Sequence, residues 1–465
     1  MENRKKNFSE WYNEIVETAE LSDKRYHVKG MNVWRPYGLK IMQGIDGIIR
    51  RLVDSRDFDE VSFPVPVTKD QLMVEFEHVK GFEGELYWIT RGGHENLDVE
   101  LALRPTSEAA MYPMFSLWIR SHADLPMKLY QIVSVYRHET KHTRSFIRIR
   151  EIHFFEAHTA HATYEDAEKQ MVQYKEIWER LADELCLPYI TNRRPDWDKF
   201  PGARYTLAFD TLLPSSRSLQ IGTIHQYGTN FSENYDIKYA DDDGEHHFVS
   251  QTTFGMSERL LAAVIGVHGD DKGLILPPGI APVQVIIVPI PSESEDTIGY
   301  SRKIGDDLLK MGFRVRVDDR DNYTPGYKYN DWEMRGVPVR VEIGVREVGS
   351  GNVTVALRSK KGKKVMSRGD FVSGVTGLLG EVKASMKESA DKLFLSLLTD
   401  SSSLDDMKKA IGATAAYWCG SKECADHIEA EADLDPLGFV NGTEDVGKCI
   451  VCGTDGKKSV FSKSY

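Results

Sequence analysis

A stretch that alternates charged and apolar residues, 135–158, constrains the possible fold more than any other part of the sequence. Two strand-like runs flank the short basic loop ETKHTRSF. This arrangement predicts an antiparallel pair with Glu139 opposite Phe146 and Arg137 opposite Arg148. Because side chains alternate between the two faces of a strand, one face of the pair is expected to be charged and the other apolar.

The charged face is expected to carry a mixed set of side chains: Arg137, Glu139, Arg148, Arg150, Phe154, Glu156 and His158. The other face is expected to carry Ile147, Ile149 and Phe155. A solvated antiparallel face is the ordinary interpretation of such a pattern. However, the preceding run LYQIVSVY is apolar enough to be buried, and buried charges require a charged partner. ATP meets this requirement, because arginines pair with phosphates and an aromatic ring stacks on a base.

Composition limits the class of protein. The chain has 465 residues, of which 41% are hydrophobic and 28% charged, so it predicts a globular protein of about three domains. The net charge of -12 does not exclude nucleic acid, because binding needs only a local basic surface. The sequence has no signal-peptide pattern and no run of about 18 apolar residues. A cytoplasmic protein without a membrane span is expected.

Residues 1–281 contain no flexible linker and predict one large domain. Its first strong helix covers residues 38–55 and leads into the run EVSFPVPVT. Pro64 and Pro66 lack the N–H that a central strand needs, so this run is expected at a sheet edge or an interface.

Residues 282–395 alternate strands and helices in a regular way, which predicts a small α/β domain with a mostly parallel sheet. The basic tract RSKKGKK within it is expected to be a solvated turn. Residues 396–465 form a third unit, which contains the segments CGSKEC and CIVC.

Four of the five cysteines crowd into the last 47 residues, whereas Cys186 stands alone. The spacing is CxxxxC, then 24 residues, then CxxC, formed by Cys419, Cys424, Cys449 and Cys452. Four thiolates satisfy a closed tetrahedral Zn²⁺ site, which predicts a structural zinc. The alternative is a set of reduced cysteines that never meet as a tetrad.

Common nucleotide-binding signatures such as GxxxxGK[ST] are absent, yet other motifs form an ordered set. Pro64 after a long helix, YRHE with FIRIRE, and GMSERLLAAVIGVHGD resemble motifs 1, 2 and 3 of class II aminoacyl-tRNA synthetases. RPTSE, DLPMKLYQ, GTIHQYGTNFS, DNYTPGYKYNDWEMRGVPVRVEIG and the terminal Ser464-Tyr465 resemble prolyl-tRNA synthetases of the archaeal and eukaryotic type. The resemblance covers nearly the whole chain.

This resemblance implies an α+β catalytic domain whose antiparallel class II sheet is flanked by helices. It also implies an α/β anticodon-binding domain and a small α/β zinc-binding domain at the C-terminus. The implied activity is a ligase that attaches L-proline to tRNA(Pro) through a prolyl-adenylate, using ATP with Mg²⁺. Motif 1 implies a homodimer. Tyr465 is expected to reach toward the catalytic domain, as in relatives.

The resemblance also assigns roles to individual residues. For ATP these are Arg137 at the α-phosphate, Glu139 at the adenine amino group, Arg148 and Arg259 at the distal phosphates, and Gln220 and Thr223 near the adenosine. For proline they are Thr106 and Glu108 at the ammonium, Arg137 at the carboxylate, and Phe154, Phe200 and His225 around the ring. For the anticodon they are Glu333, Arg340 and Glu347. Phe154 departs from the tryptophan typical of eukaryotic relatives.

Several alternatives remain open from the sequence. Phe154 and Phe200 fit a plain core, and His225 fits a structural histidine. A threonyl enzyme would need cysteine in its zinc-containing pocket, but Cys186 is the only cysteine in the first 400 residues. Histidyl and glycyl enzymes leave the terminal cysteine unit unexplained. An RNA-binding relative without catalysis is the rival from another functional class.

The expected accuracy of the enzyme follows from its length. Residues 156–255 leave no room for the large editing insertion of bacterial-type relatives. A site shaped for pyrrolidine excludes larger side chains but discriminates poorly against smaller ones. Misactivation of cysteine and alanine, without editing by this chain, is therefore expected.

Overall fold

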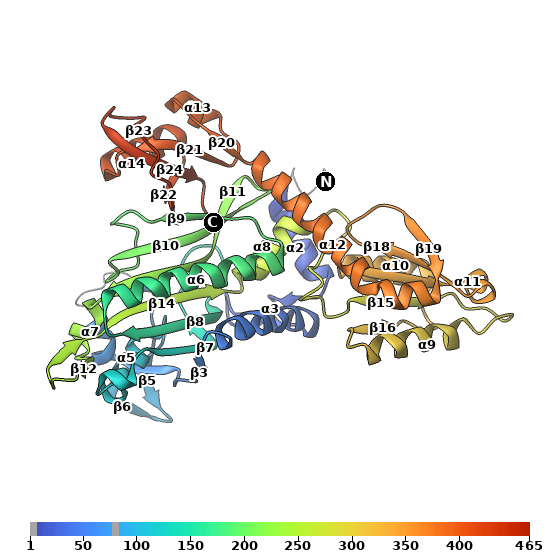
Figure 1. The fold of residues 1–465 in the computed structure, drawn as a ribbon, viewed down its shortest axis with the longest axis horizontal. Coiled ribbons are helices and arrows are strands. Elements are labelled where there is room, and N and C mark those ends of the chain that lie inside the picture. Colours follow the sequence, from blue (N-terminus) through green and yellow to red (C-terminus); the bar gives the residue numbers. More distant parts are fainter. Residues whose placement is uncertain (1–6, 77–82) are drawn as a thin grey trace.

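The computed structural model describes residues 7–76 and 83–465, which form three packed units (Figure 1). One unit is built on a large sheet, a second is an α/β unit at one end of the molecule, and the third is the C-terminal segment beside the large sheet. Among the helices in the described ranges, none is long and apolar enough to cross a membrane.

The large sheet has twelve strands, eleven of which follow one continuous order. That order is β20 (Leu398–Asp400), β21 (Ala413–Trp418), β24 (Asp455–Ser462), β22 (Asp435–Val440), β9 (Ile190–Arg193), β10 (Tyr205–Leu213), β11 (Arg217–Gly228), β14 (Ser250–Ser257), β8 (Glu151–His161), β7 (Met127–Tyr136) and β3 (Asp59–Glu60). The remaining strand, β23 (Val446–Lys448), pairs with β24. All neighbours from β9 to β7 are antiparallel, which confirms the antiparallel sheet expected of the first domain.

The charged strand pair is β7 with β8, but its register differs from the predicted one. Tyr136 pairs with Glu151, and the N–H of Arg137 donates to the carbonyl of Arg150 at 2.9 Å. Arg137 therefore lies opposite Arg150 and not opposite Arg148. The predicted register was wrong by two residues, because the second strand begins only at Glu151.

The segment before β8 turns instead of pairing with β7, and Phe146 adopts a φ of 62° within that turn. The guanidinium of Arg150 donates to the carbonyl of Glu139 at 2.9 and 3.1 Å. Arg150 is absent from the lining of the cavity described below, contrary to prediction, whereas Ile147 and Ile149 line it. The predicted division of charged and apolar faces therefore holds within β8 and fails in the turn.

Three helices pack against the large sheet or its end: α3 (Pro36–Asp54), α6 (Tyr164–Leu185) and α8 (Arg259–His268). Trp178 on α6 stacks on Phe209 of β10 with ring centroids 4.1 Å apart. Gly222 on β11 permits this approach, because a Cβ there would lie 2.4 Å from the indole. Phe254 of β14 also contacts Trp178, while its neighbour Thr253 points to the opposite face. The helices thus cover one face of the sheet and leave the other for a site.

The run with the two prolines divides between two sheets. β3 forms the edge of the large sheet, and β4 (Pro66–Thr68) forms the edge of a small sheet with β6 (Glu95–Leu103) and β5 (Tyr87–Gly92). The expected edge position is confirmed. The prediction of one continuous strand is wrong, because the residues between β3 and β4 belong to no strand.

The α/β unit has a five-stranded sheet in the order β16 (Val315–Val317), β15 (Val285–Pro289), β17 (Val339–Ile343), β18 (Asn352–Leu357) and β19 (Lys363–Ser367). β15 is parallel to β16 and β17, whereas β18 and β19 form an antiparallel hairpin. The helices are α9 (Thr297–Lys310), α10 (Pro325–Met334), α11 (Val345–Ser350) and α12 (Arg368–Ser396). The basic tract forms the turn of the hairpin, as predicted.

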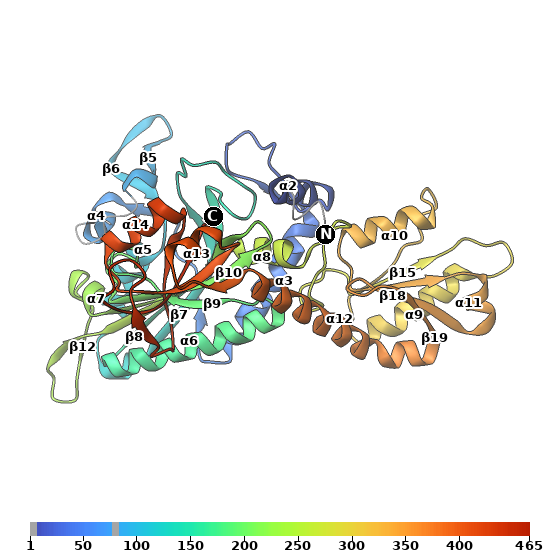
Figure 2. The same cartoon turned by 90° about the horizontal axis from the view of Figure 1, so that it is seen from above.

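The C-terminal segment contains α13 (Leu404–Lys409) and α14 (Lys422–Ala432), and α12 leads into it from the α/β unit (Figure 2). It does not have a sheet of its own. Phe439 of β22 pairs with Arg193 of β9, so its strands extend the large sheet. Arg194 reinforces this joint by donating to the carbonyl of Leu437 at 2.9 Å.

Candidate active site

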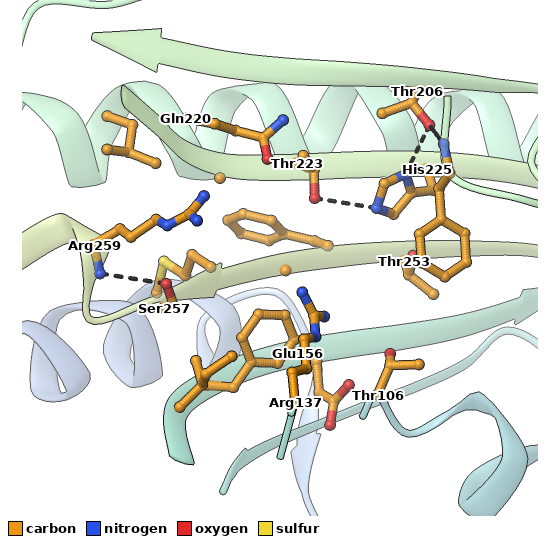
Figure 3. A pocket seen from close by; sticks show the side chains of 18 of the residues that line it. Thr106, Arg137, Glu156, Thr206, Gln220, Thr223, His225, Thr253, Ser257 and Arg259 are labelled. Carbon is orange, nitrogen blue, oxygen red and sulfur yellow. Dashed lines mark hydrogen bonds between the residues drawn. The ribbon is translucent and has the colours of Figure 1, made fainter. Parts of the chain in front are cut away.

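A cavity of about 550 Å³ lies on the face of the large sheet away from α6 (Figure 3). β8, β10, β11 and β14 form its floor, and the start of α8 closes one end. Every residue that the sequence assigned to ATP or to proline lines this one cavity: Thr106, Glu108, Arg137, Glu139, Arg148, Phe154, Phe200, Gln220, Thr223, His225 and Arg259. These residues come from several segments of the chain, of which the first, at Thr106, and the last, at Arg259, are more than 100 positions apart.

Three arginines surround one part of the cavity. Arg259 begins α8, as predicted, and its Nε donates to the carbonyl of Ile147 at 2.9 Å. Burial, together with the positive charge of Arg137, lowers the pKa of Arg259 to about 10. Arg148 lies 3.8 Å from the carboxylate of Glu139. Buried cations that repel one another favour an anionic ligand, and a polyphosphate supplies the required charge.

A buried carboxylate marks another part of the cavity. Glu108 is the first residue of α5 (Glu108–Trp118) and is 2% exposed. Its Oε1 accepts a hydrogen bond from Tyr227 at 2.8 Å, and its Oε2 accepts one from Thr106 at 2.5 Å. Thr253 donates in turn to the Tyr227 hydroxyl at 3.0 Å. This network fixes a negative charge where a ligand ammonium could pair with it.

Aromatic rings wall the cavity beside this carboxylate. The rings of Phe200 and His225 lie 4.7 Å apart, and His225 stacks parallel to Tyr227. Both nitrogens of His225 are hydrogen-bonded, Nδ1 to Thr206 at 2.9 Å and Nε2 to Thr223 at 3.1 Å. Burial lowers the pKa of His225 to about 3, so the ring is neutral at physiological pH. His225 is therefore a well-bonded histidine that also lines the cavity.

Phe154 packs tightly against the strand beside it. A Cβ on Gly255 of β14 would lie 3.0 Å from the Phe154 ring, so the glycine lets the ring lie flat on the sheet. Both residues line the cavity. The plain-core alternative for Phe154 thus does not account for its position, because its ring borders open space.

The four C-terminal cysteines meet, although they come from two segments. Their sulfur atoms all lie within 4.8 Å of one another, and those of Cys419 and Cys452 are 3.8 Å apart. A tetrahedron with Zn–S bonds of about 2.3 Å has edges of about 3.8 Å. The cluster could therefore hold a metal ion, and the alternative of cysteines that never meet is wrong.

The three residues assigned to the anticodon lie on three different elements, and each side chain has a partner within the protein. Arg340 on β17 pairs with Glu342 and lies over the ring of Tyr329 at 4.6 Å. Glu347 caps the start of α11, where it accepts from the N–H of Gly344 at 2.9 Å. Glu333 near the end of α10 pairs instead with Lys272, which follows α8, at 2.9 Å.

Models of three families match consecutive parts of the chain: "tRNA synthetase class II core domain (G, H, P, S and T)" at 87–268, "Anticodon binding domain" at 284–378 and "Prolyl-tRNA synthetase, C-terminal" at 404–465. Proline–tRNA ligase of Thermoplasma volcanium is 65% identical over the whole of both chains. That of Thermococcus kodakarensis is 50% identical and covers 99% of this chain and 98% of its own. The chain belongs to the proline–tRNA ligase family.

Solved structures of the prolyl-tRNA synthetase family agree with this placement. The chain superposes on Giardia lamblia prolyl-tRNA synthetase with a TM-score of 0.95, at 34% identity and 99% coverage of both chains. For the Cryptosporidium parvum enzyme the TM-score is 0.94, at 32% identity, with coverage of 99% and 98%. The predicted family and fold class are confirmed, and the threonyl, histidyl and glycyl alternatives are set aside.

Sequence reasoning gave no role to two buried residues, Glu258 in the cavity lining and Tyr227 behind Glu108. Tyr227 lies in the quoted motif GTIHQYGTNFS but was given no role, although it holds Glu108. Glu258 precedes Arg259 and is 2% exposed, and its Oε2 has no hydrogen-bond partner within the described ranges. Burial raises the pKa of Glu258 to about 7. A carboxylate next to a motif arginine was the available signal for Glu258.

Proposed function

We propose that the chain attaches L-proline to tRNA(Pro) in two steps through a prolyl-adenylate. The observation that carries the proposal is the single cavity, with its three arginines and the buried, hydrogen-bonded Glu108. Two similar structures contain related ligands: the Giardia enzyme is in complex with prolyl-adenylate, and the Cryptosporidium enzyme is complexed with halofuginone and AMPPNP.

In the first step, a carboxylate oxygen of proline attacks the α-phosphorus of ATP. An oxygen–phosphorus bond forms, the bond to the bridging oxygen breaks, and pyrophosphate leaves with the electron pair. Arg137 holds the attacking carboxylate and the α-phosphate, while Arg148 and Arg259 hold the leaving group. Fixed cations of this kind stabilise the charge that develops during in-line displacement, so no protein nucleophile is required.

In the second step, a hydroxyl of the terminal tRNA ribose attacks the carbonyl carbon of the adenylate. The ester bond forms, the bond between the carbonyl carbon and the phosphate oxygen breaks, and AMP leaves while its phosphate accepts the hydroxyl proton. Throughout both steps, Thr106 and Glu108 orient the proline ammonium, and Phe154, Phe200 and His225 surround its ring. Glu139 recognises the adenine amino group.

Mg²⁺ fits the phosphate region of this cavity. The ion prefers oxygen donors and commonly keeps several waters while bridging phosphates. The cavity lining includes the buried Oε2 of Glu258, which has no hydrogen-bond partner within the described ranges, and we propose that acidic or amide oxygens of the lining hold the ion or its waters. Bound Mg²⁺ would neutralise part of the phosphate charge during activation.

We assign residues 1–281 to the catalytic domain, 282–395 to the anticodon-binding domain and 396–465 to the C-terminal domain. The C-terminal domain would bind one structural Zn²⁺ through Cys419, Cys424, Cys449 and Cys452. The four sulfurs support this, because their spacing matches a closed tetrahedral site with no position left for a substrate.

We further propose that the enzyme is a homodimer assembled through motif 1. β3, which follows the motif 1 helix α3, is the last strand in the order of the large sheet. Such an edge is open to pairing or packing with a second copy. Sedimentation equilibrium at micromolar protein should give twice the chain mass of 52.8 kDa, and a single-chain mass would contradict the proposal.

The proposed enzyme activates alanine and cysteine to a measurable extent. Each missing methylene costs only about 1–3 kcal/mol of discrimination, so a pyrrolidine site rejects smaller side chains weakly. Between β8 and β14 the chain forms only α6, β9, β10, β11, a short helix and a small hairpin. We expect no deacylation of alanyl-tRNA(Pro) beyond the spontaneous rate when AMP and pyrophosphate are absent. Rapid release of alanine would reveal an editing site.

The test of the overall reaction is charging of a tRNA transcript with a proline anticodon. The enzyme with ATP, Mg²⁺ and labelled proline should form acid-precipitable prolyl-tRNA, and proline should also stimulate ATP–pyrophosphate exchange without tRNA. Binding of tRNA with neither activity would instead support the non-catalytic RNA-binding alternative.

A further inference from the structure

Arg340 is held at two points by a buried carboxylate. Its Nε and Nη2 both donate to Oε1 of Glu342, at 3.2 and 3.1 Å. Glu342 is only 7% exposed, and its Oε2 accepts from the Nζ of Lys363 at 2.6 Å. One carboxylate therefore bridges two cations, and each of its oxygens has a charged donor.

The strand register explains why these three side chains meet. Arg340 and Glu342 occupy alternate positions of β17 and share a face. Across the sheet, Arg340 pairs with Ala356 of β18, which pairs with Lys363 of β19. Because Ala356 carries only a methyl group, the long side chain of Lys363 can cross it to reach Glu342.

An aromatic ring fixes the remaining freedom of Arg340. The guanidinium carbon lies 4.6 Å from the ring centroid of Tyr329 on α10, and the Nζ of Lys363 lies 5.6 Å from the same centroid. Contact with the ring restrains tilt of the guanidinium, while Glu342 restrains its rotation in the plane. The side chain of Arg340 is 18% exposed, so its tip still reaches solvent.

The hydrogen bonds of Arg340 leave one edge of the guanidinium available. Nε and one hydrogen of Nη2 serve Glu342, and within residues 7–76 and 83–465 no partner is found for Nη1. Parallel donors from Nη1 and Nη2 match O6 and N7 of guanine. Proline codons begin with two cytosines, so their anticodons contain two guanines.

We infer that Glu342, assisted by Lys363 and Tyr329, positions Arg340 so that its Nη1–Nη2 edge reads O6 and N7 of an anticodon guanine. The inference rests on the proposed role of Arg340 and deepens it. Glu347 differs from Glu342, because its oxygens hold the N–H of Gly344 and the hydroxyl of Thr354. Glu347 thus caps α11 and is a weaker candidate for contact with a base.

The test compares full-length wild type, Glu342→Gln and Arg340→Ala on tRNA transcripts altered at each guanine of the anticodon. 7-Deazaguanine removes N7, whereas inosine keeps O6 and N7 and loses only the amino group. At one of the two positions, wild type should charge the 7-deazaguanine transcript about 10-fold less efficiently than the guanine transcript, and inosine should have little effect.

Glu342→Gln should lower kcat/KM for guanine tRNA by about 10- to 100-fold and bring the 7-deazaguanine ratio close to one. Proline-dependent pyrophosphate exchange should be unchanged, which also shows that the variant is folded. Glu388→Gln, a matched change on the exposed side of α12, should behave as wild type. Lys363→Met should give a smaller loss of the same kind.

The outcomes separate the inference from the function on which it rests. If Arg340→Ala abolishes the 7-deazaguanine effect but Glu342→Gln retains it, the positioning role is wrong and Arg340 remains the reader. If Arg340→Ala charges all transcripts as wild type does, the proposed role of Arg340 fails and the inference fails with it. Equal loss of exchange and charging in Glu342→Gln would indicate a general structural role and overturn the inference.

Discussion

Arg259 is fixed by its own backbone position and by one side-chain bond. It begins α8, and Nε is engaged by the carbonyl of Ile147, so its terminal nitrogens extend into the cavity (Figure 3). Within residues 7–76 and 83–465, Nε is the one nitrogen of this guanidinium with a hydrogen-bond partner, so Nη1 and Nη2 can donate to phosphate oxygens. The contribution of Arg259 should therefore be greatest when charge moves onto the leaving pyrophosphate.

Arg259→Ala should lower the rate of proline activation by about 100-fold or more, while proline affinity changes by less than about 3-fold. The reason is that Arg259 is proposed to bind the phosphates of ATP, whereas Glu108 is proposed to hold the proline ammonium. Pyrophosphate exchange gives the rate, and calorimetric titration with proline gives the affinity. Equal losses in both would show that Arg259 is misplaced in this account.

Glu258 should give the fold a distinctive pH dependence. Burial raises the pKa of its carboxyl from the ordinary 4.5 to about 7 in the folded chain. Between these values the folded state binds more protons than the unfolded state, so this group destabilises the fold progressively as pH rises from about 4.5 to 7. Above pH 7 the cost is complete and is on the order of 3 kcal/mol.

Glu258→Gln removes this cost without changing the shape of the side chain. The variant should melt at a higher temperature than wild type at pH 8, and the difference should vanish near pH 4.5. Thermal denaturation of both proteins across this pH range measures the effect. A difference that is constant with pH would contradict the assigned titration.

Individual residues of the site were predictable from the sequence where a motif carried them. Thr106 and Glu108 in RPTSE, and Arg137 and Glu139 in YRHE, meet in the cavity as expected. Arg150 stood in the same charged run, but its guanidinium donates to the backbone carbonyl of Glu139. Whether an arginine side chain faces a ligand or donates to a nearby carbonyl depends on the shape of the turn, which the residue pattern does not specify.

At the scale of elements, periodicity located most helices and strands but did not set their pairing. The β7–β8 register depends on a turn in which Phe146 has a positive φ, an unusual state for a bulky residue. The two prolines gave an edge position correctly, since a missing N–H is a local property. The second sheet that contains β4 depends on partners about 35 residues away and has no local signal.

The cysteine cluster is the element whose role can be tested independently of catalysis. Cys424→Ala should reduce bound zinc from about one ion per chain to nearly none, because a closed site needs all four thiolates. Cys186→Ser should leave the zinc content unchanged, since Cys186 is not part of the four-cysteine cluster. Cys186 is buried, and its thiol donates to the carbonyl of Lys383. Elemental analysis of purified proteins measures both. Active wild type without zinc would refute the assignment.

At the scale of the whole molecule, the C-terminal segment is part of the catalytic sheet. β22 pairs with β9, and the loop after β9 carries Phe200 on the cavity wall. Trp197 in that loop packs edge-on against Trp418, the residue before Cys419, with ring centroids 5.5 Å apart. The sequence indicated a third unit but not that its strand β22 pairs with β9. Pairing between strands some 240 residues apart has no signal in the local periodicity.

The cavity is proposed to activate proline at the expense of ATP. ATP–pyrophosphate exchange with each of the twenty amino acids, without tRNA, measures this activation. We expect the strongest stimulation by proline, weaker exchange with cysteine and alanine, and none above background with larger side chains. Absence of stimulation by proline, or stronger stimulation by another amino acid, would contradict the proposal.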